Sequence, residues 1–142
     1  MKKVLALDLE GTLISNAVSQ IPRPGLYDFL DQAKKLFPRI VIFTTVPDEL
    51  FRCVARGLVN SGDVPAWFAE LQHVKWEGQV KDLRFVNDSS VEDILLVDDY
   101  EGYVSEDQKK QWIAIKSFES PYQADDRELI RILDELSALC RR

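Results

Sequence analysis

The feature that most constrains this chain is a short apolar run, Val4 to Leu7, that stops at Asp8 and Glu10. Such a run is typical of a strand buried on both faces of a sheet. Open α/β sheets hold their functional groups at the carboxyl ends of these strands, although a strand that simply ends in a polar loop would look similar. Gly11 allows a tight turn at this point, and the hydroxyl of Thr12 can hold it, which leaves nearby amides free to bind an anion.

Further apolar runs alternate with amphipathic helical patterns along the chain. Strands are predicted over 39–45, 93–99 and 112–116, and helices over 26–36, 48–60 and 125–140. This alternation predicts an α/β fold, a doubly wound and mainly parallel sheet with helices on both faces. A chain of 142 residues fits one domain, so we expect a single domain over 1–142.

Three segments give more local predictions. A short helix over 63–71 would be capped by Asp63, with Pro65 in its first turn. Residues 73–82 fit a loop or a short extended piece. Asp125 and Glu128 resemble a capping box at the start of the last helix. The apolar stripe expected on that helix is Leu129, Ile130, Leu133, Leu136 and Cys140.

The charge balance limits the partners of this chain. It carries 18 Lys and Arg residues against 24 Asp and Glu residues, a formal net charge of −6. General nucleic-acid and membrane-surface binders need clustered basic residues, so neither class is expected. Cys53 and Cys140 lack the spacing of a zinc site or a disulfide framework. The apolar run after Lys2 and Lys3 is too short for a signal peptide or membrane span, so we expect a cytoplasmic protein.

Acids and a threonine converge if the sheet is parallel. Asp8, Thr44 and Asp98 would then each lie at the carboxyl end of a strand and meet at one edge. Four carboxylates would gather there, those of Asp8, Glu10, Asp98 and Asp99. They would repel one another unless a cation lay among them, and Mg²⁺ suits hard oxygen ligands with open positions. A carboxylate fixed beside Mg²⁺ can attack phosphorus to give an aspartyl-phosphate, while a second acid moves the proton.

The order of these groups resembles the four motifs of the haloacid dehalogenase superfamily of phosphotransferases. The motifs are Asp-Leu-Glu-Gly-Thr from Asp8, the apolar run to Thr44, Lys81, and the pair Asp98-Asp99. Within the superfamily the chain is most similar to the NLI-interacting-factor-like phosphatases, whose eukaryotic members act on the carboxy-terminal repeats of RNA polymerase II. The matching segments are 23–30, 40–44, 80–83 and 94–99. The resemblance implies a Rossmann-like core and Mg²⁺-dependent phosphatase activity.

The resemblance also implies a role for each motif residue. Asp8 is the expected nucleophile, and Glu10 is the expected general acid and base. The expected phosphate-binding groups are Thr44, Thr45 and Lys81, and Lys81 would also hold the nucleophile in place. The expected Mg²⁺ ligands are Asp8, Glu10 through its backbone carbonyl, and one or both of Asp98 and Asp99.

Two departures from the family pattern bear on activity and substrate. The family usually has aspartate where this chain has Glu10, and the extra methylene moves the proton-transfer group by about a bond length. We expect activity, with a rate that depends on where this carboxylate lies. The polymerase-directed signature Asp-x-Asp-x-Thr is not intact, so the substrate of the eukaryotic relatives is not carried over.

The connections around the motifs are short. Between Leu13 and Arg23, and between Val46 and Lys81, there is no room for a large cap domain. We therefore expect an open site suited to a bulky substrate, with a phosphoprotein favoured and a polynucleotide end or a small phosphorylated metabolite as alternatives.

Aromatic residues cluster before the lysine motif. Trp67, Phe68 and Trp76 could line a substrate surface, but core packing is the favoured interpretation for each. His73, the only histidine, is expected on the surface rather than as a catalytic base.

Two interpretations without hydrolysis compete with this one. A response-regulator receiver also uses acids, Mg²⁺, a threonine and a lysine on a doubly wound sheet. Its paired acids follow the first strand, whereas here Asp98 and Asp99 come after Lys81. A degenerate phosphatase that only accepts a phosphoryl group, or binds a partner, is the remaining alternative because of Glu10.

Overall fold

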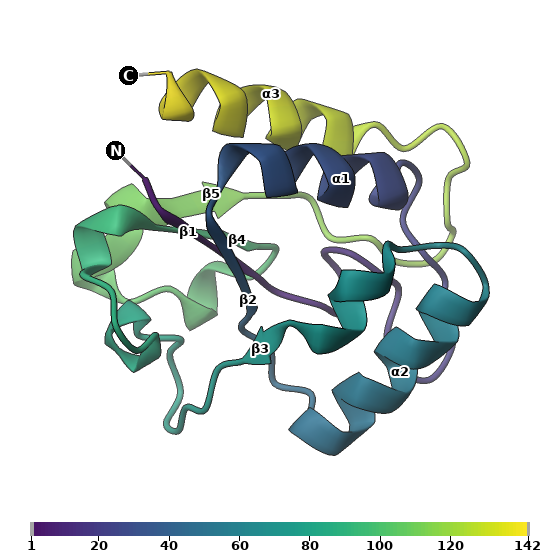
Figure 1. The fold of residues 1–142 in the computed structure, drawn as a ribbon, viewed down its shortest axis with the longest axis horizontal. Coiled ribbons are helices and arrows are strands. Elements are labelled where there is room, and N and C mark those ends of the chain that lie inside the picture. Colours follow the sequence, from purple (N-terminus) through teal and green to yellow (C-terminus); the bar gives the residue numbers. More distant parts are fainter. Residues whose placement is uncertain (1, 142) are drawn as a thin grey trace.

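Five parallel strands form the centre of the structure, a computed structural model that describes residues 2–141 (Figure 1). In spatial order the sheet runs β3-β2-β1-β4-β5, and every neighbouring pair is parallel. The strands are β1 (Val4–Leu7), β2 (Arg39–Ile42), β3 (Gln72–His73), β4 (Ile94–Asp98) and β5 (Trp112–Ala114). The predicted doubly wound parallel sheet is confirmed.

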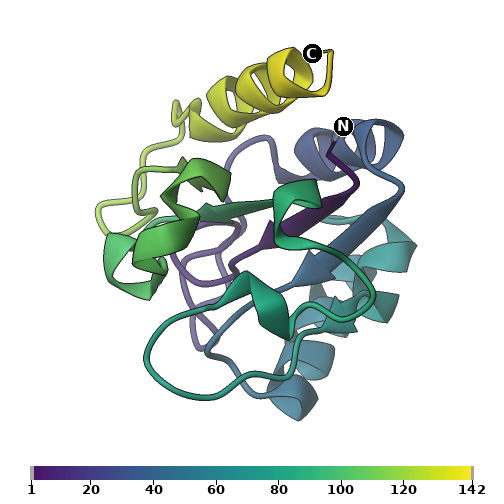
Figure 2. The same ribbon diagram turned by 90° about the vertical axis from the view of Figure 1, so that its left-hand side faces the viewer.

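The two faces of the sheet are covered differently. The α-helices α1 (Leu26–Leu36), α2 (Asp48–Asn60) and α3 (Glu128–Cys140) share one apolar cluster, and α1 and α3 lie side by side (Figures 1 and 2). The opposite face is covered by loops and short 3₁₀ helices. These include η2 (Leu83–Phe85), η3 (Val91–Asp93) and η4 (Glu101–Tyr103). Helical turns therefore lie on both faces, as predicted, but those on the second face are short 3₁₀ helices.

Alternation along the strands builds two apolar layers. Leu5 and Leu7 of β1 face the α-helices, whereas Val4 and Ala6 face the 3₁₀ side. All four side chains are buried, which explains why β1 is continuously apolar rather than alternating.

The winding of the sheet reverses at β1, and this reversal positions the site. Leu7 of β1 pairs with Val97 of β4, and the Asp8 N–H donates to the Val97 carbonyl at 3.0 Å. Asp8 and Asp98 therefore leave adjacent strands side by side. A crevice at the carboxyl edge beside such a reversal is where open α/β sheets bind ligands.

The remaining 3₁₀ helices are η1 (Ala66–Glu70) and η5 (Glu106–Gln111). Two predicted helix starts are wrong, those of η1 and of α3. Pro65, not Asp63, is the N-cap of η1, and the Asp63 N–H closes the end of α2 by donating to the Leu58 carbonyl. At α3 the Glu128 N–H donates to Asp126 rather than to Asp125. Neighbouring acids are equivalent in a sequence pattern, and the path of the chain decides between them.

Some predicted core positions also change. Ile130 is 44 % exposed, and Ile132 takes its place in the buried stripe of α3. The segment 73–82 carries the end of the two-residue strand β3, within the predicted choice of loop or short extended piece. In the described part of the chain, none of the helices has the length and apolar character that crossing a membrane requires.

Candidate active site

A buried lysine joins two of the predicted site carboxylates. Lys81 has no exposed surface, and its Nζ donates to Asp8 Oδ1 at 2.9 Å and to Asp98 Oδ2 at 2.5 Å. Asp98 is likewise fully buried, and its second oxygen accepts the Tyr100 N–H at 3.0 Å. Both oxygens of Asp98 are thus occupied by protein donors.

The charges of this group are strongly coupled. Burial raises the pKa of Asp8 well above its usual range, although the Lys81 charge acts in the opposite direction. Burial likewise raises the pKa of Asp98, again against the effect of Lys81. Burial alone would lower the pKa of Lys81, but the charges of Asp8 and Asp98 outweigh it and raise that pKa. Desolvation and ion pairing therefore compete within one small volume.

Three carboxylates form a cluster that could hold a metal ion. One oxygen each from Asp8, Asp98 and Asp99 lies within 4.8 Å of the other two. Hard oxygen donors at this spacing fit a divalent cation, which would offset the negative charge that Lys81 leaves uncompensated. The side chain of Glu10 is outside this cluster.

The turn after β1 explains why glycine and threonine follow the acids. Gly11 has φ +77°, and a side chain there would collide with the Asp99 carboxylate. The Thr12 hydroxyl donates to Asp8 Oδ2 at 2.8 Å, and Asp99 Oδ1 lies 3.3 Å from the same hydroxyl. The predicted hydroxyl bond therefore exists, but it orients the candidate nucleophile itself rather than the backbone of the turn.

Glu10 is held by the loop that follows it. Its Oε2 accepts the Ala17 N–H at 2.7 Å, so one carboxylate oxygen is anchored and the other is available. The side chain is half-buried and lines the same cavity as Asp8. The extra methylene of glutamate is thus accommodated by a specific backbone donor.

The two threonines after β2 face different surroundings. Thr44 is buried, and its hydroxyl accepts the Val46 N–H at 3.1 Å. Thr45 is exposed and lines the cavity together with Asp8 and Asp99. The structure therefore brings both predicted threonines to the same edge, but only Thr45 lines this cavity, and the buried Thr44 lines a neighbouring hollow.

The cavity over these groups has a volume of about 390 Å³. Two tyrosines form part of its wall, with Tyr100 56 % exposed and its ring 4.9 Å from that of Tyr103. Its lining is Asp8, Glu10, Thr45, Asp99, Tyr100, Tyr103, Ser117 and Glu119. A buried carboxylate pinned by a lysine and a hydroxyl, beside a cluster of acids, suits phosphoryl transfer.

Comparison with known families agrees with this geometry. Residues 3–141 match the family described as NLI interacting factor-like phosphatase. The chain belongs to this family. The suspected resemblance is confirmed, and the protein is a phosphatase, a phosphoric monoester hydrolase. No curated protein matches the chain.

Two residues that support this phosphatase site were not assigned a role from sequence. Arg23 is 1 % exposed, and its Nη1 donates to the carbonyls of Gly11 and Thr12 at 3.3 and 3.2 Å. The rest of its guanidinium forms a two-pronged ion pair with Asp126, 3.1 Å on each side. Gln108, 3 % exposed, accepts the Leu83 N–H and so fixes the segment that carries the lysine.

The sequence held one signal for Arg23, its position between two prolines in a connector that leads into a helix. Its partners could not be inferred, because Asp126 lies 103 residues further along the chain. Among the aromatics, Phe68 is fully buried as expected, whereas Trp76 is only half-buried and lines a groove. His73 is half-buried, not a surface residue, and its Nε2 donates to the Val46 carbonyl at 2.7 Å.

Proposed function

We propose that this phosphatase works through an aspartyl-phosphate formed on Asp8 and requires Mg²⁺. The observation that carries the proposal is the state of the Asp8 carboxylate. It lines the cavity while Lys81 and Thr12 each hold one of its oxygens, at 2.9 and 2.8 Å. With both oxygens held in this way, the carboxylate is oriented so that it can attack a phosphorus atom from one direction only.

Asp99 is the better candidate than Asp98 for direct metal binding. Asp98 is fully buried and does not line the cavity, whereas Asp99 is half-buried and lines it together with Asp8. Asp8, Asp99 and the Glu10 carbonyl would hold Mg²⁺, and Asp98 would position Lys81. When bound, Mg²⁺ would neutralise charge on the phosphoryl oxygens.

The chain's own groups account for each proton and bond in two displacements. An oxygen of Asp8 forms a bond to phosphorus while the ester O–P bond breaks, and Glu10 gives its proton to the leaving oxygen. Glu10 then takes a proton from water as that water attacks phosphorus. The Asp8–phosphorus bond breaks, which releases phosphate and restores the carboxylate. Thr45, which lines the cavity, would contact the phosphoryl oxygens, and Lys81 beneath Asp8 would hold that carboxylate in place and offset its charge throughout.

A phosphoprotein is the favoured substrate. The cavity mouth carries Glu10 and Glu119, and acids there repel the neighbouring phosphates of a polynucleotide. The short 3₁₀ turns and loops around the cavity leave it open to a folded or extended protein chain.

The decisive experiment follows hydrolysis of p-nitrophenyl phosphate with and without Mg²⁺. We expect Mg²⁺-dependent turnover in the wild type and none in Asp8→Asn, which is isosteric but cannot form the acyl-phosphate. Acid quenching during turnover of a ³²P-labelled phosphomonoester should leave label on the wild-type protein only. Turnover that persists in Asp8→Asn would refute the mechanism, and stable labelling without turnover would favour a phosphoryl-accepting module.

A further inference from the structure

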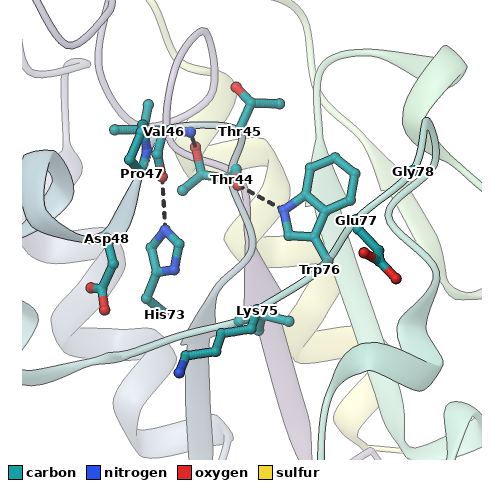
Figure 3. A pocket seen from close by; sticks show the side chains of 11 residues that line it. Thr44, Thr45, Val46, Pro47, Asp48, His73, Lys75, Trp76, Glu77 and Gly78 are labelled. Carbon is teal, nitrogen blue, oxygen red and sulfur yellow. Dashed lines mark hydrogen bonds between the residues drawn. The ribbon is translucent and has the colours of Figure 1, made fainter.

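A second hollow, of about 480 Å³, lies next to the catalytic cavity, and Thr45 lines both. We call it the Trp76 groove. It runs between the loop after β2 and the segment after β3, residues 44–48 and 73–78 (Figure 3). A substrate whose phosphoryl group reached Asp8 past Thr45 would have its adjoining atoms at the mouth of this groove.

Both walls of the Trp76 groove are held rigidly. Trp76 Nε1 donates to the Thr44 carbonyl at 2.8 Å, and its ring packs edge-on against Phe43 and Tyr103. His73, the last residue of β3, donates to the Val46 carbonyl, so both bonds tie the β3 wall to the loop after β2 (Figure 3). The groove is therefore formed before any ligand arrives, which lowers the entropic cost of binding.

The groove combines an apolar wall with unused backbone groups. Val46, Pro47 and the Trp76 ring provide apolar surface. Within residues 2–141, the backbone groups of 75–80 make no hydrogen bond to another residue. This segment continues from β3, one of the two edge strands of the sheet, as far as a bend that begins at Gly78, which has φ +92°. Unpaired backbone beside an edge strand is the feature to which extended peptides bind.

The charge around the groove further limits the class of molecule that can bind there. The rim of the groove carries Asp48, Lys75 and Glu77, and the adjoining cavity mouth carries Glu10 and Glu119. Four carboxylates outnumber the two cations, the Lys75 ammonium and the Arg52 guanidinium that pairs with Asp48 at 3.1 Å, and this excess disfavours a polyanion such as a nucleic acid. A polypeptide, which can be neutral or basic, has no such penalty.

We propose that the Trp76 groove binds an extended segment of the substrate polypeptide next to the phosphorylated residue. A bulky apolar side chain of that segment packs against Trp76 and Pro47, and so sets sequence preference. This inference rests on the proposed function for the position of the phosphoryl group, but it concerns binding rather than catalysis.

The test measures binding, so that it does not depend on turnover. The probes are fluorescein-labelled hexapeptides with a non-hydrolysable phosphonate in place of phosphoserine, flanked either by leucine or by alanine only. Fluorescence polarisation with the full chain should give about tenfold tighter binding of the leucine peptide, the effect of burying one such side chain.

Lys75→Trp, which places a ring in the groove, should abolish that tenfold preference. Lys35→Trp, an equal change on the solvent side of α1, should preserve it. Asp48→Tyr fills the groove from the opposite wall and should also abolish the preference, so the test still works if Lys75→Trp misfolds. Melting curves show whether each of the two variants is folded. Turnover of p-nitrophenyl phosphate, which does not extend into the groove, should stay within about twofold in all three variants.

Equal binding of the two peptides, or a preference that survives both blocking variants, would overturn the groove proposal while leaving the catalytic one intact. Tighter binding of a 3′-phosphorylated oligonucleotide than of either peptide would also overturn it. If the wild type did not hydrolyse p-nitrophenyl phosphate but still preferred the leucine peptide, only the catalytic mechanism would be refuted.

Discussion

The carboxyl ends of β1 and β4 differ sharply from those of β2 and β3, although all four strands meet at one edge of the sheet. Asp8 follows β1 and Asp98 ends β4, and both are buried and joined by charge-assisted hydrogen bonds to Lys81, which comes from the segment between β3 and β4. After β2 and β3, the two segments of the chain diverge and form a groove between them. Single neutral hydrogen bonds from Trp76 and His73 hold the two segments together.

This difference separates chemistry from recognition. Buried ion pairs are costly to break, so the β1–β4 side should tolerate almost no substitution. Neutral hydrogen bonds at a half-open groove each contribute about 1 kcal/mol, so the β2–β3 side can change its residues and keep the fold. Variants on the two sides should therefore differ in both activity and stability.

The largest effect is expected for Lys81→Met on the β1–β4 side. It removes the buried cation and leaves two carboxylates without their partner, which should cost about 3–5 kcal/mol of folding free energy. Activity should be lost, while urea denaturation measures the stability. Adding Asp98→Asn should recover part of the stability without restoring activity. A double variant no more stable than Lys81→Met would show that the pair is not coupled.

Glu10→Gln should lower kcat by about 10²–10⁴-fold, the usual contribution of a positioned acid or base. The amide oxygen can still accept the Ala17 N–H, so the loop should keep its shape and melting temperature. An alkyl phosphate, with a poor leaving group, should lose more of its single-turnover phosphorylation rate than p-nitrophenyl phosphate. Equal losses for the two substrates would argue against Glu10 as the proton donor.

Gly11→Ala tests the tight approach of the two acid-bearing loops, and Gly25→Ala is its matched control. Both glycines have φ near +80°, so both variants carry backbone strain of about 1–2 kcal/mol. Only at Gly11 would the new methyl group meet Asp99, because nothing lies within 4 Å of it at Gly25. We expect similar drops in melting temperature but a loss of activity, on the order of 10²-fold, at Gly11 alone.

The parallel sheet explains why much of this site could be predicted from sequence. Asp8 and Asp98 follow apolar runs, and parallel pairing brings the ends of such runs together whatever the loops between them do. The turn at Gly11 was predictable for a different reason, because its chemistry is local, whereas the acceptor of the Thr12 hydroxyl, Asp8, was not predicted.

Other features depend on long-range packing and could not be predicted. Arg23 acts through backbone carbonyls and through Asp126, and neither partner has a fixed spacing from it. The different surroundings of Thr44 and Thr45 depend on how the chain leaves β2 after Ile42. Successive residues of an extended chain point to opposite sides, so a difference of one position exchanges a buried hydroxyl for an exposed one.

The smallest effect is expected on the β2–β3 side, for Trp76→Phe. Phenylalanine keeps an aromatic wall but cannot donate to the Thr44 carbonyl, so the folding free energy should fall by only about 1–2 kcal/mol. Turnover of p-nitrophenyl phosphate should change less than about threefold, because phenylalanine keeps a ring to pack against Tyr103, whose own ring lies 4.8 Å from Lys81 Nζ. Urea denaturation and steady-state kinetics measure the two quantities on the same preparation. A loss of activity as large as that of Glu10→Gln would mean that the groove and the catalytic carboxylates form one coupled unit, and would remove the distinction between the two sides of this edge.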